Sequence, residues 1–197
     1  YKSQLNSVWQ QMPKHIKELL CQQDGLCRLI KPIAIFSAEQ TKLIGQRHGF
    51  QVALEHECTS SNDILLSQTR QNATDIHRQV CITHSQSAGR GQQGRTWQHR
   101  LGECLMFSLA WSFPQPQHQL SALTLTVALA CYRSLNKLGI KVQIKWPNDL
   151  VIGNLKLGGI LIETVRQESK TVAIIGIGIN FMAPKSMKQA TSIQAAS

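Results

Sequence analysis

The sequence predicts an α+β domain built on a mixed, mostly antiparallel sheet with helices on one face. Segments with the two-residue apolar period of strands outnumber segments with helical spacing. Several of these strand candidates are joined by short turns, which favours antiparallel neighbours. The chain has 197 residues, enough for one good-sized domain with a small appendage.

The first fifty residues contain two helix candidates. Residues 5–20 carry apolar side chains at helical spacing. Residues 23–25 have the composition of a turn, and the short, apolar, proline-interrupted stretch 26–36 is expected to be a connector. Ser37 is a suitable N-cap for a short helix that ends near Gly45.

From residue 50 onward, the apolar spacing typical of helices and strands is clearer. Either Ser60 or Ser61 is a suitable N-cap for a helix. Apolar residues at every second position from 105 to 113 are typical of a half-buried strand, and Gly153-Asn154 has the composition of a tight hairpin turn. The expected elements are strand 50–57, a helix from 60 or 61 to about 69, strand 79–84, a glycine-rich loop 87–94, strand 105–113, helix 119–138, and strands 141–146, 150–152, 155–165 and 171–180.

The formal net charge of +10 is large for this length. Solubility is the simplest explanation of this charge. Two more specific explanations are the binding of small anionic substrates, such as nucleotides, and the binding of nucleic acid. The six cysteines include no CxxC pair and the seven histidines do not cluster at ligand spacing. We therefore expect a reduced, cytoplasmic protein without a zinc site. No apolar stretch is long enough to span a bilayer, so no membrane partner is expected.

A glycine loop with two arginines follows strand 79–84. The segment Gly89-Arg90-Gly91-Gln92-Gln93-Gly94-Arg95 contains the spacing GxGxxG, but another strand follows it where a dinucleotide-binding fold would begin a helix. It also lacks the Gly-Lys-Ser/Thr of a Walker loop. Glycine lets backbone amides approach an anion, and guanidinium groups bind phosphate bidentately. The loop is therefore a candidate anion-binding lid, with a flexible surface loop as the alternative.

Three further elements place charge or glycine on neighbouring strands. Lys145-Trp146-Pro147-Asn148-Asp149 sets a lysine and a carboxylate on either side of a turn. Lys156 begins a strand that contains Gly158-Gly159, and a later strand ends in Gly176-Ile177-Gly178-Ile179-Asn180. Glycine weakens a strand unless something must approach its backbone. The set indicates a flat ligand lying over these strands, with close sheet packing as the alternative for each element.

Together these motifs resemble the biotin–protein ligase family. The resemblance rests on Gln86 to Gly91 through Trp97, on the three elements above, and on Ser60-Ser61-Asn62, which is similar to that family's Ser-Thr-Asn turn. It covers about residues 50–180. It implies a catalytic domain of the biotin/lipoate ligase type, similar to class II synthetases. The implied activity is ATP-dependent formation of biotinyl-5′-AMP and transfer of biotin to a lysine of the biotin carboxyl carrier domain of acetyl-CoA carboxylase.

The resemblance also implies roles for individual residues. Lys156 would hold the biotin carboxylate and the α-phosphate, and Asp149 is our candidate to accept the proton of the carrier lysine. Mg²⁺ would accompany ATP near Asn148 and Asp149 and would not be fixed by the protein alone. The implied catalytic residues are Lys156, Asp149, Arg90 and Lys145. The implied biotin contacts are Ser60, Ser61, Asn62, Gln86, Gly89, Arg90, Gly91, Gln92, Lys156, Gly159, Gly176 and Gly178. The implied ATP contacts are Arg95, Trp97, Asn148, Ile160 and Asn180.

The resemblance bears on the ends of the chain as well. Residues 1–30 are expected to be the tail of a winged helix-turn-helix region, and residues 31–197 a catalytic domain truncated before the family's C-terminal β domain. DNA would be a partner only if a full winged helix lay upstream, and a homodimer is a further expected assembly. Gln92 stands where the family often has arginine, and Glu103-Cys104 replaces a small residue and an asparagine.

Three other functions stay open at this point. A lipoate–protein ligase shares the fold and the reaction type. A DNA-binding repressor could use biotinyl-AMP only as a signal. An inactive scaffold would follow if the missing C-terminal domain were essential.

Overall fold

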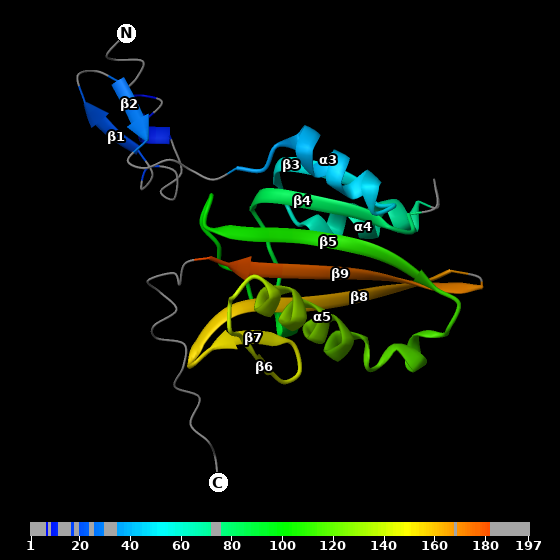
Figure 1. Ribbon diagram of the computed structural model, residues 1–197. Coiled ribbons are helices and arrows are strands. Elements are labelled where there is room, and N and C mark those ends of the chain that lie inside the picture. The colour runs from blue at the N-terminus through cyan, green and yellow to red at the C-terminus, as the bar shows by residue number, and fades with distance from the viewer. Residues whose placement is uncertain are drawn as a thin grey trace.

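A computed structural model shows a seven-stranded sheet flanked by helices (Figure 1). It describes residues 35–71, 76–167 and 169–181, together with residues 7, 9–11, 17, 20–23 and 26–29. Most of the helix expected over 5–20 and the whole tail after residue 181 lie outside the described residues. None of the helices in the described ranges is long and apolar enough to cross a membrane.

The first described elements form an antiparallel hairpin that the sequence analysis missed. Strand β1 (Leu20–Gln23) pairs with β2 (Leu26–Leu29), so Leu20 lies opposite Leu29. The expectation of a helix through residue 20 and a connector from residue 26 is therefore wrong at these positions. The physical reason is visible in the sequence, because Asp-Gly between two short apolar runs is a strong signal for a two-residue hairpin. The prediction of a winged helix-turn-helix tail over residues 1–30 stays a prediction.

The next four elements match the expectations closely. Helix α3 (Ala38–Arg47) begins after Ser37, whose hydroxyl accepts a hydrogen bond from the Gln40 amide at 3.3 Å. Strand β3 (Gln51–Cys58) leads into α4 (Ser61–Arg70), and β4 (Gln79–Gln86) follows. Ser60 occupies the N-cap position of α4.

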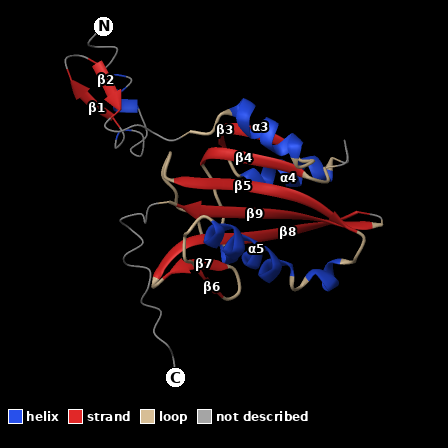
Figure 2. Ribbon diagram, in the orientation of Figure 1, coloured by secondary structure: helices blue, strands red, loops and turns tan. Residues whose placement is uncertain are grey.

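The remaining elements complete the sheet. They are β5 (Cys104–Phe113), a short 3₁₀ turn (Gln117–Leu120), α5 (Leu123–Lys137), β6 (Gln143–Lys145), β7 (Asp149–Ile152), β8 (Leu155–Gln167) and β9 (Lys170–Asn180). The spatial order is β3-β4-β5-β9-β8-β7-β6, and only β3 and β4 are parallel (Figure 2). The mixed, mostly antiparallel sheet is confirmed. The strand expected over 141–146 is shorter, because Trp146 begins the turn into β7 and is 80% exposed.

Helices cover both faces of the sheet, which corrects the expectation of one covered face. Successive residues of β9 point to opposite sides. One set, Ala173, Ile175, Ile177 and Ile179, belongs to the same buried cluster as Ala128 and Leu135 of α5. The other set, Val172 and Ile174, belongs to a second cluster with Leu65 and Leu66 of α4. The reason is that β9 is apolar at nearly every position, a pattern typical of strands buried on both faces.

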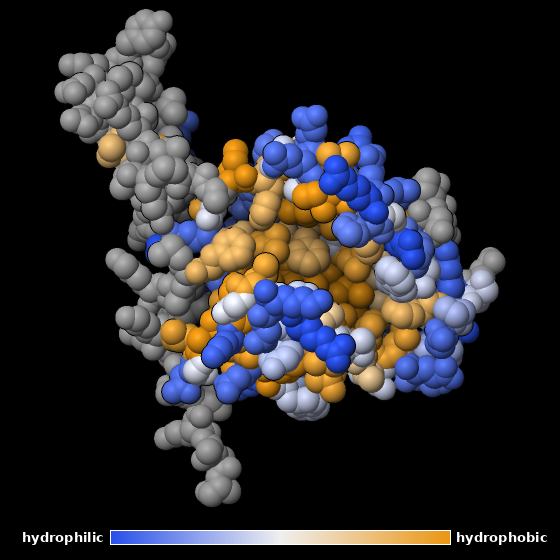
Figure 3. Space-filling view, in the orientation of Figure 1, coloured by the Kyte–Doolittle hydropathy of each residue, from blue (hydrophilic) through white to orange (hydrophobic). Residues whose placement is uncertain are grey.

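Helix α5 covers only part of its face. It packs on β6, β7 and β8, and Figure 3 shows an apolar hollow beside it. The outward side of α5 carries three exposed apolar side chains, Leu125, Leu129 and Tyr132. The alternating apolar side chains of β5 from Leu105 to Phe113 are only partly buried, whereas Met106, Ser108 and Ala110 on the α4 side are fully buried.

Candidate functional site

A cleft opens on the α4 side where the sheet, the start of α4 and the glycine loop meet. It is open to solvent, and about 490 Å³ of space, part of it open solvent, lies between its walls. Its lining residues are Ser60, Ser61, Asn62, Gln86, Arg90, Gly91, Gln92, Trp97, Phe107, Asn148, Lys156, Gly159, Ile160, Leu161, Gly176, Ile177 and Gly178. Four of the predicted motifs and the Ser60-Ser61-Asn62 turn therefore meet in one place.

A chain of hydrogen bonds forms the polar floor of the cleft. The Ser108 hydroxyl donates to Asn62 Oδ1 at 2.5 Å, and the hydroxyls of Ser61 and Ser108 lie 2.7 Å apart. Each hydroxyl has one proton, so the Ser61 hydroxyl donates to that of Ser108. The Ser61 amide donates to Gln86 Oε1 at 2.8 Å. Ser61, Asn62 and Ser108 are all buried, so these bonds fix the orientation of the floor.

Two glycines of β9 allow other side chains to reach the sheet. A Cβ at Gly176 would lie 2.5 Å from Asn62 Oδ1, and a Cβ at Gly178 would lie 2.4 Å from the Trp97 ring. Glycine is needed at both positions because no real Cβ tolerates such contacts. At these two positions the groups that approach the strand are side chains of the protein itself, as the alternative of close packing expects, and the flat ligand stays a prediction.

Lys156 and Trp97 form the opposite end of the cleft. The Lys156 ammonium lies 2.7 Å from Asp149 Oδ1 and 6.0 Å from the centroid of the Trp97 ring. The Trp97 Nε1 is buried without a hydrogen-bond partner. Buried polar groups normally have a partner, so this N–H is a donor that a bound ligand could satisfy.

The glycine loop is closed on itself by backbone hydrogen bonds. The Trp97 amide donates to the Gly89 carbonyl at 2.8 Å, and the Gly91 amide donates to the Arg95 carbonyl at 2.6 Å. Arg90 and Thr96 form an isolated antiparallel bridge. Only a three-residue 3₁₀ turn, Gln92–Gly94, lies inside the loop, and β5 follows. The absence of a helix beginning at Gly94 agrees with the rejection of a dinucleotide-binding fold, and the lid hypothesis stays a prediction.

Arg90 is held by two carboxylates. Its two terminal nitrogens lie 2.6 Å from Asp63 Oδ1 and 2.9 Å from Glu163 Oε2. Partial burial alone would lower the pKa of the guanidinium, but the hydrogen bonds that it donates to Asp63 and Glu163 outweigh this effect and raise that pKa. Arg90 is therefore a permanently charged residue that already has partners at both ends.

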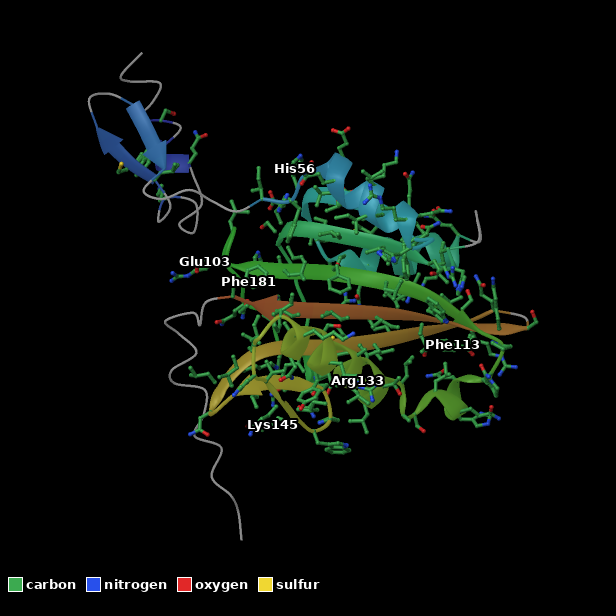
Figure 4. The ribbon with its side chains drawn as sticks, viewed as in Figure 1. His56, Glu103, Phe113, Arg133, Lys145 and Phe181 are labelled. Atoms are coloured by element: carbon green, nitrogen blue, oxygen red, sulfur yellow. The ribbon has the colours of Figure 1, made fainter. Side chains whose placement is uncertain are left out.

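Five predicted site residues do not line the cleft. Asp149 contacts it through Lys156, and Gly89 lies under the loop, where a Cβ would meet Gln86 and Trp97. Asn180 is buried at the end of β9, beside the point where the Phe181 amide donates to the Glu103 carbonyl at 2.8 Å (Figure 4). The other two are exposed: Arg95 on the glycine loop, and Lys145 on the edge strand β6.

Sequence reasoning missed six residues of the site. Phe107, Leu161 and Ile177 line the cleft, and each lies on a strand whose apolar pattern gave no sign of contact with a ligand. Ser108, Asp63 and Glu163 hold the lining residues in place. Ser108, a polar residue in the middle of the mainly apolar strand β5, was the one available signal. In the described part of the chain, no group of three or more His, Cys, Asp or Glu side chains could hold a metal ion.

The sequence of this chain matches a known protein family. A model of the Biotin/lipoate A/B protein ligase family matches residues 55–180. The chain therefore belongs to the Biotin/lipoate A/B protein ligase family, as its motifs suggested.

Individual relatives narrow the similarity to the biotin branch. The chain is 36% identical over 154 residues to the bifunctional ligase/repressor BirA of Escherichia coli. The matched region covers 77% of this chain and 46% of BirA. It is 30% identical over 189 residues to BirA of Bacillus subtilis, covering 88% of this chain and 55% of that protein. The chain thus spans about half the length of these relatives.

Solved structures give the same picture. The biotin acetyl coenzyme A carboxylase synthetase of Helicobacter pylori, with bound biotinylated ATP, superposes with a TM-score of 0.55 at 29% identity, over 69% of this chain and 63% of that one. The biotin protein ligase of Leishmania major in complex with biotinyl-5-AMP gives a TM-score of 0.57 at 26% identity, over 70% of this chain and 60% of that one.

Proposed function

We propose that this chain is the catalytic part of an ATP-dependent biotin–protein ligase. It forms biotinyl-5′-AMP and transfers biotin to a lysine of a biotin carboxyl carrier domain, such as that of acetyl-CoA carboxylase. The observation that carries the proposal is the polarity of the cleft. One end is a neutral hydrogen-bonding floor around Asn62, and the other end presents the ammonium of Lys156.

Biotin has a matching polarity. Its ureido ring is neutral and carries both donors and an acceptor, which suits Ser61, Asn62 and Gln86. Its valeryl chain is apolar, which suits Leu161, the partner of Gly176 on the cleft side of the sheet, and its carboxylate suits Lys156. Burying a polar group of the ligand without a hydrogen bond costs roughly 1–3 kcal/mol, and the fixed floor offers donors and acceptors that the ureido group of biotin can use.

Lys156 would serve the first half-reaction. The biotin carboxylate must approach the α-phosphate of ATP, and two unit charges about 4 Å apart repel by roughly 4 kcal/mol at an effective dielectric near 20. An ammonium between them offsets that repulsion and the charge that develops on the phosphate. The Trp97 ring, lying over Gly178 and Gly159, provides an aromatic surface on which the adenylate can rest.

Asp149 would serve the second half-reaction. The attacking lysine of the carrier has a pKa near 10.4 in water, so it arrives protonated and must lose a proton. When Lys156 turns from Asp149 toward the ligand, the Asp149 carboxylate loses its partner and can accept that proton or orient the amine.

Mg²⁺ would enter with the triphosphate. Such sites commonly combine one or two protein oxygens with phosphate oxygens. The Asn148 side chain donates through its nitrogen to the Ile160 carbonyl at 3.0 Å, so its oxygen is not used in that bond. That oxygen and the Asp149 carboxylate are the protein ligands that fit, and bound Mg²⁺ would neutralise charge on the phosphates.

The alternative of lipoate is disfavoured by the same floor. The dithiolane ring of lipoate carries no strong hydrogen-bonding group, so it would gain no hydrogen bond from Ser61, Asn62 or Gln86 while covering these polar groups. Isothermal titration with biotin and with lipoate tests the proposal. We expect saturable binding of biotin and at least about tenfold weaker binding of lipoate. Preference for lipoate would contradict the assignment.

The wider biological setting is part of the proposal. We propose a reduced, cytoplasmic setting. The free thiols support it, and they are those of Cys21, Cys58, Cys81, Cys104 and Cys131. DNA binding would need a complete winged helix before residue 1. A homodimer would be detected by its mass in solution.

A further inference from the structure

We propose that Glu163 is a positioning residue that couples the floor of the cleft to the glycine loop. The inference rests on the proposed function only for the identity of the ligand. Glu163 lies on β8 and was assigned no role from the sequence. Its carboxylate is the point at which the hydrogen-bond chain of the floor and the ion pairs of the loop meet.

The contacts of Glu163 fall on two different elements. Its Oε2 accepts from Asn62 Nδ2 at 2.8 Å and from an Arg90 terminal nitrogen at 2.9 Å. The same Arg90 nitrogen lies 3.1 Å from Oε1. Asn62 lies in the first turn of α4 and Arg90 lies in the glycine loop, so one carboxylate joins two residues that lie 28 positions apart (90 − 62).

The floor determines which end of the Asn62 amide meets Glu163. The Ser108 hydroxyl donates to Asn62 Oδ1, and a Cβ at Gly176 would clash with the same oxygen. The NH₂ end must therefore point to Glu163, which as a carboxylate can only accept. Asn62 is 3% exposed, so a reversed amide would leave buried groups without partners.

The loop end of the coupling has an electrostatic consequence. Arg90 contributes one positive charge, and Asp63 and Glu163 contribute two negative charges, so the three side chains carry a net charge of −1. This end of the cleft is therefore not a phosphate-binding site in the unliganded protein. We assign Arg90 to holding the loop over the floor, and we leave the anionic end of the ligand to Lys156.

Glu163→Gln weakens one function of the carboxylate and keeps the other. A glutamine oxygen in the place of Oε2 can still accept from Asn62 and Arg90, but the negative charge is lost, and the NH₂ group in the place of Oε1 would face the Arg90 nitrogen, donor against donor. The floor should stay intact while the tie to the loop weakens. Trypsin can report this directly in the unliganded chain, because the loop contains Arg90 and Arg95.

We expect Glu163→Gln to speed cleavage after Arg90 and Arg95 by about three- to fivefold, the range for a partly exposed ion pair. Asp63→Asn should do the same, since it removes the second tie and leaves the Asn62–Glu163 bond untouched. Glu57→Gln, an exposed glutamate on β3, is the matched control and should leave the rates unchanged. Thermal unfolding identifies any variant whose faster cleavage comes from global destabilisation. If both site variants fold like the parent and are cleaved at its rate, the coupling does not exist.

A double-mutant cycle on biotin affinity shows whether Glu163 acts through Arg90. We expect Glu163→Gln and Arg90→Gln each to weaken biotin binding by about three- to tenfold, and the double variant to be no weaker than Arg90→Gln alone. Additive losses would show that Glu163 acts independently of the loop and would overturn the proposal. If the parent chain does not bind biotin, the proposed function is wrong, and the cleavage rates still decide the role of Glu163.

Discussion

The ammonium of Lys156 lies 2.7 Å from the carboxylate of Asp149, so the two residues assigned to successive half-reactions form an ion pair in the unliganded protein. Each residue neutralises the charge of the other, and a ligand that binds one of them releases its partner. An anion that draws Lys156 away leaves Asp149 without a partner, at the stage when a proton acceptor is needed. In the proposed reaction, the pair would therefore link the end of adenylation to the start of transfer.

Lys156→Ala should abolish formation of biotinyl-AMP, because the other cation in the lining of the cleft, Arg90, is already held by two carboxylates. The side chain of Asp149 is only 24% exposed, so its carboxylate would lose a partner. We expect a stability loss of roughly 1 kcal/mol after allowance for solvent screening. Mass spectrometry and urea unfolding measure the two effects, with the exposed Lys141→Ala as control. Adenylate formation at near the parent rate would remove Lys156 from the site.

Asp149→Asn should separate the two half-reactions. Asparagine keeps the shape but cannot accept a proton, so transfer from preformed biotinyl-AMP should fall by roughly 10²–10⁴, and adenylation should change less. The defect should shrink as pH rises toward the lysine pKa, because more of the amine is then neutral. If instead adenylation fails and added Mg²⁺ restores it, Asp149 serves the metal.

Gln92→Arg should slow release of biotinyl-AMP. Gln92 lines the cleft, and an arginine there could add a charge-assisted hydrogen bond to the phosphate, on the order of 1–2 kcal/mol stronger than that of an amide. The dissociation rate should then fall about five- to thirtyfold. Gln92→Lys tests whether charge alone is sufficient. An unchanged rate for both variants would show that residue 92 does not contact the phosphate.

Gly178→Ala should displace Trp97, because its Cβ would lie 2.4 Å from the ring. Gly159→Ala is the graded control, since its Cβ would lie 3.3 Å from the same ring. We expect Gly178→Ala to weaken binding of the adenylate by at least about tenfold, and Gly159→Ala to have a smaller effect. If both variants bound the adenylate as tightly as the parent, the position of Trp97 would not matter for the nucleotide.

His84 should make the fold sensitive to acid. Burial, reinforced by the neighbouring His56, lowers the pKa of His84 in the folded state. Below the unfolded value of about 6.5 the unfolded chain then binds a proton that the folded chain does not, so stability falls as pH decreases. Urea midpoints from about pH 5 to about pH 7.5 should show this slope. The slope should be smaller in His84→Gln and unchanged in His48→Gln, an exposed control. If the slope decreased equally in both variants, groups other than His84 would cause the pH dependence of stability.

The parts of this fold that the sequence predicted are those with a local signal. Ser37 and Ser60 stand where helices begin, and Gly153-Asn154 is followed by the hairpin partner of β7. For the helix starts and the hairpin, neighbouring residues in the chain determine the conformation. The glycines of β9 indicated that some group lies close to the strand, but not that Asn62 and Trp97 do.

What could not be predicted depends on contacts between distant residues. Arg90 meets Glu163 across 73 positions of sequence, and Asn62 meets Glu163 across 101. Nothing in the sequence near Glu163 distinguishes it from an exposed strand glutamate. The helices on both faces were missed for a different reason, because β9 was counted as one more strand although its continuous apolar run is typical of burial on two sides.

The central claim is that this cleft joins biotin to AMP. The most direct measurement is mass spectrometry of the chain incubated with biotin, ATP and Mg²⁺, with lipoate in place of biotin as the matched control. The account predicts biotinyl-5′-AMP from biotin, little or no adenylate from lipoate, and none from Lys156→Ala with either acid. Biotin binding without any adenylate, or an adenylate formed equally well by Lys156→Ala, would contradict it.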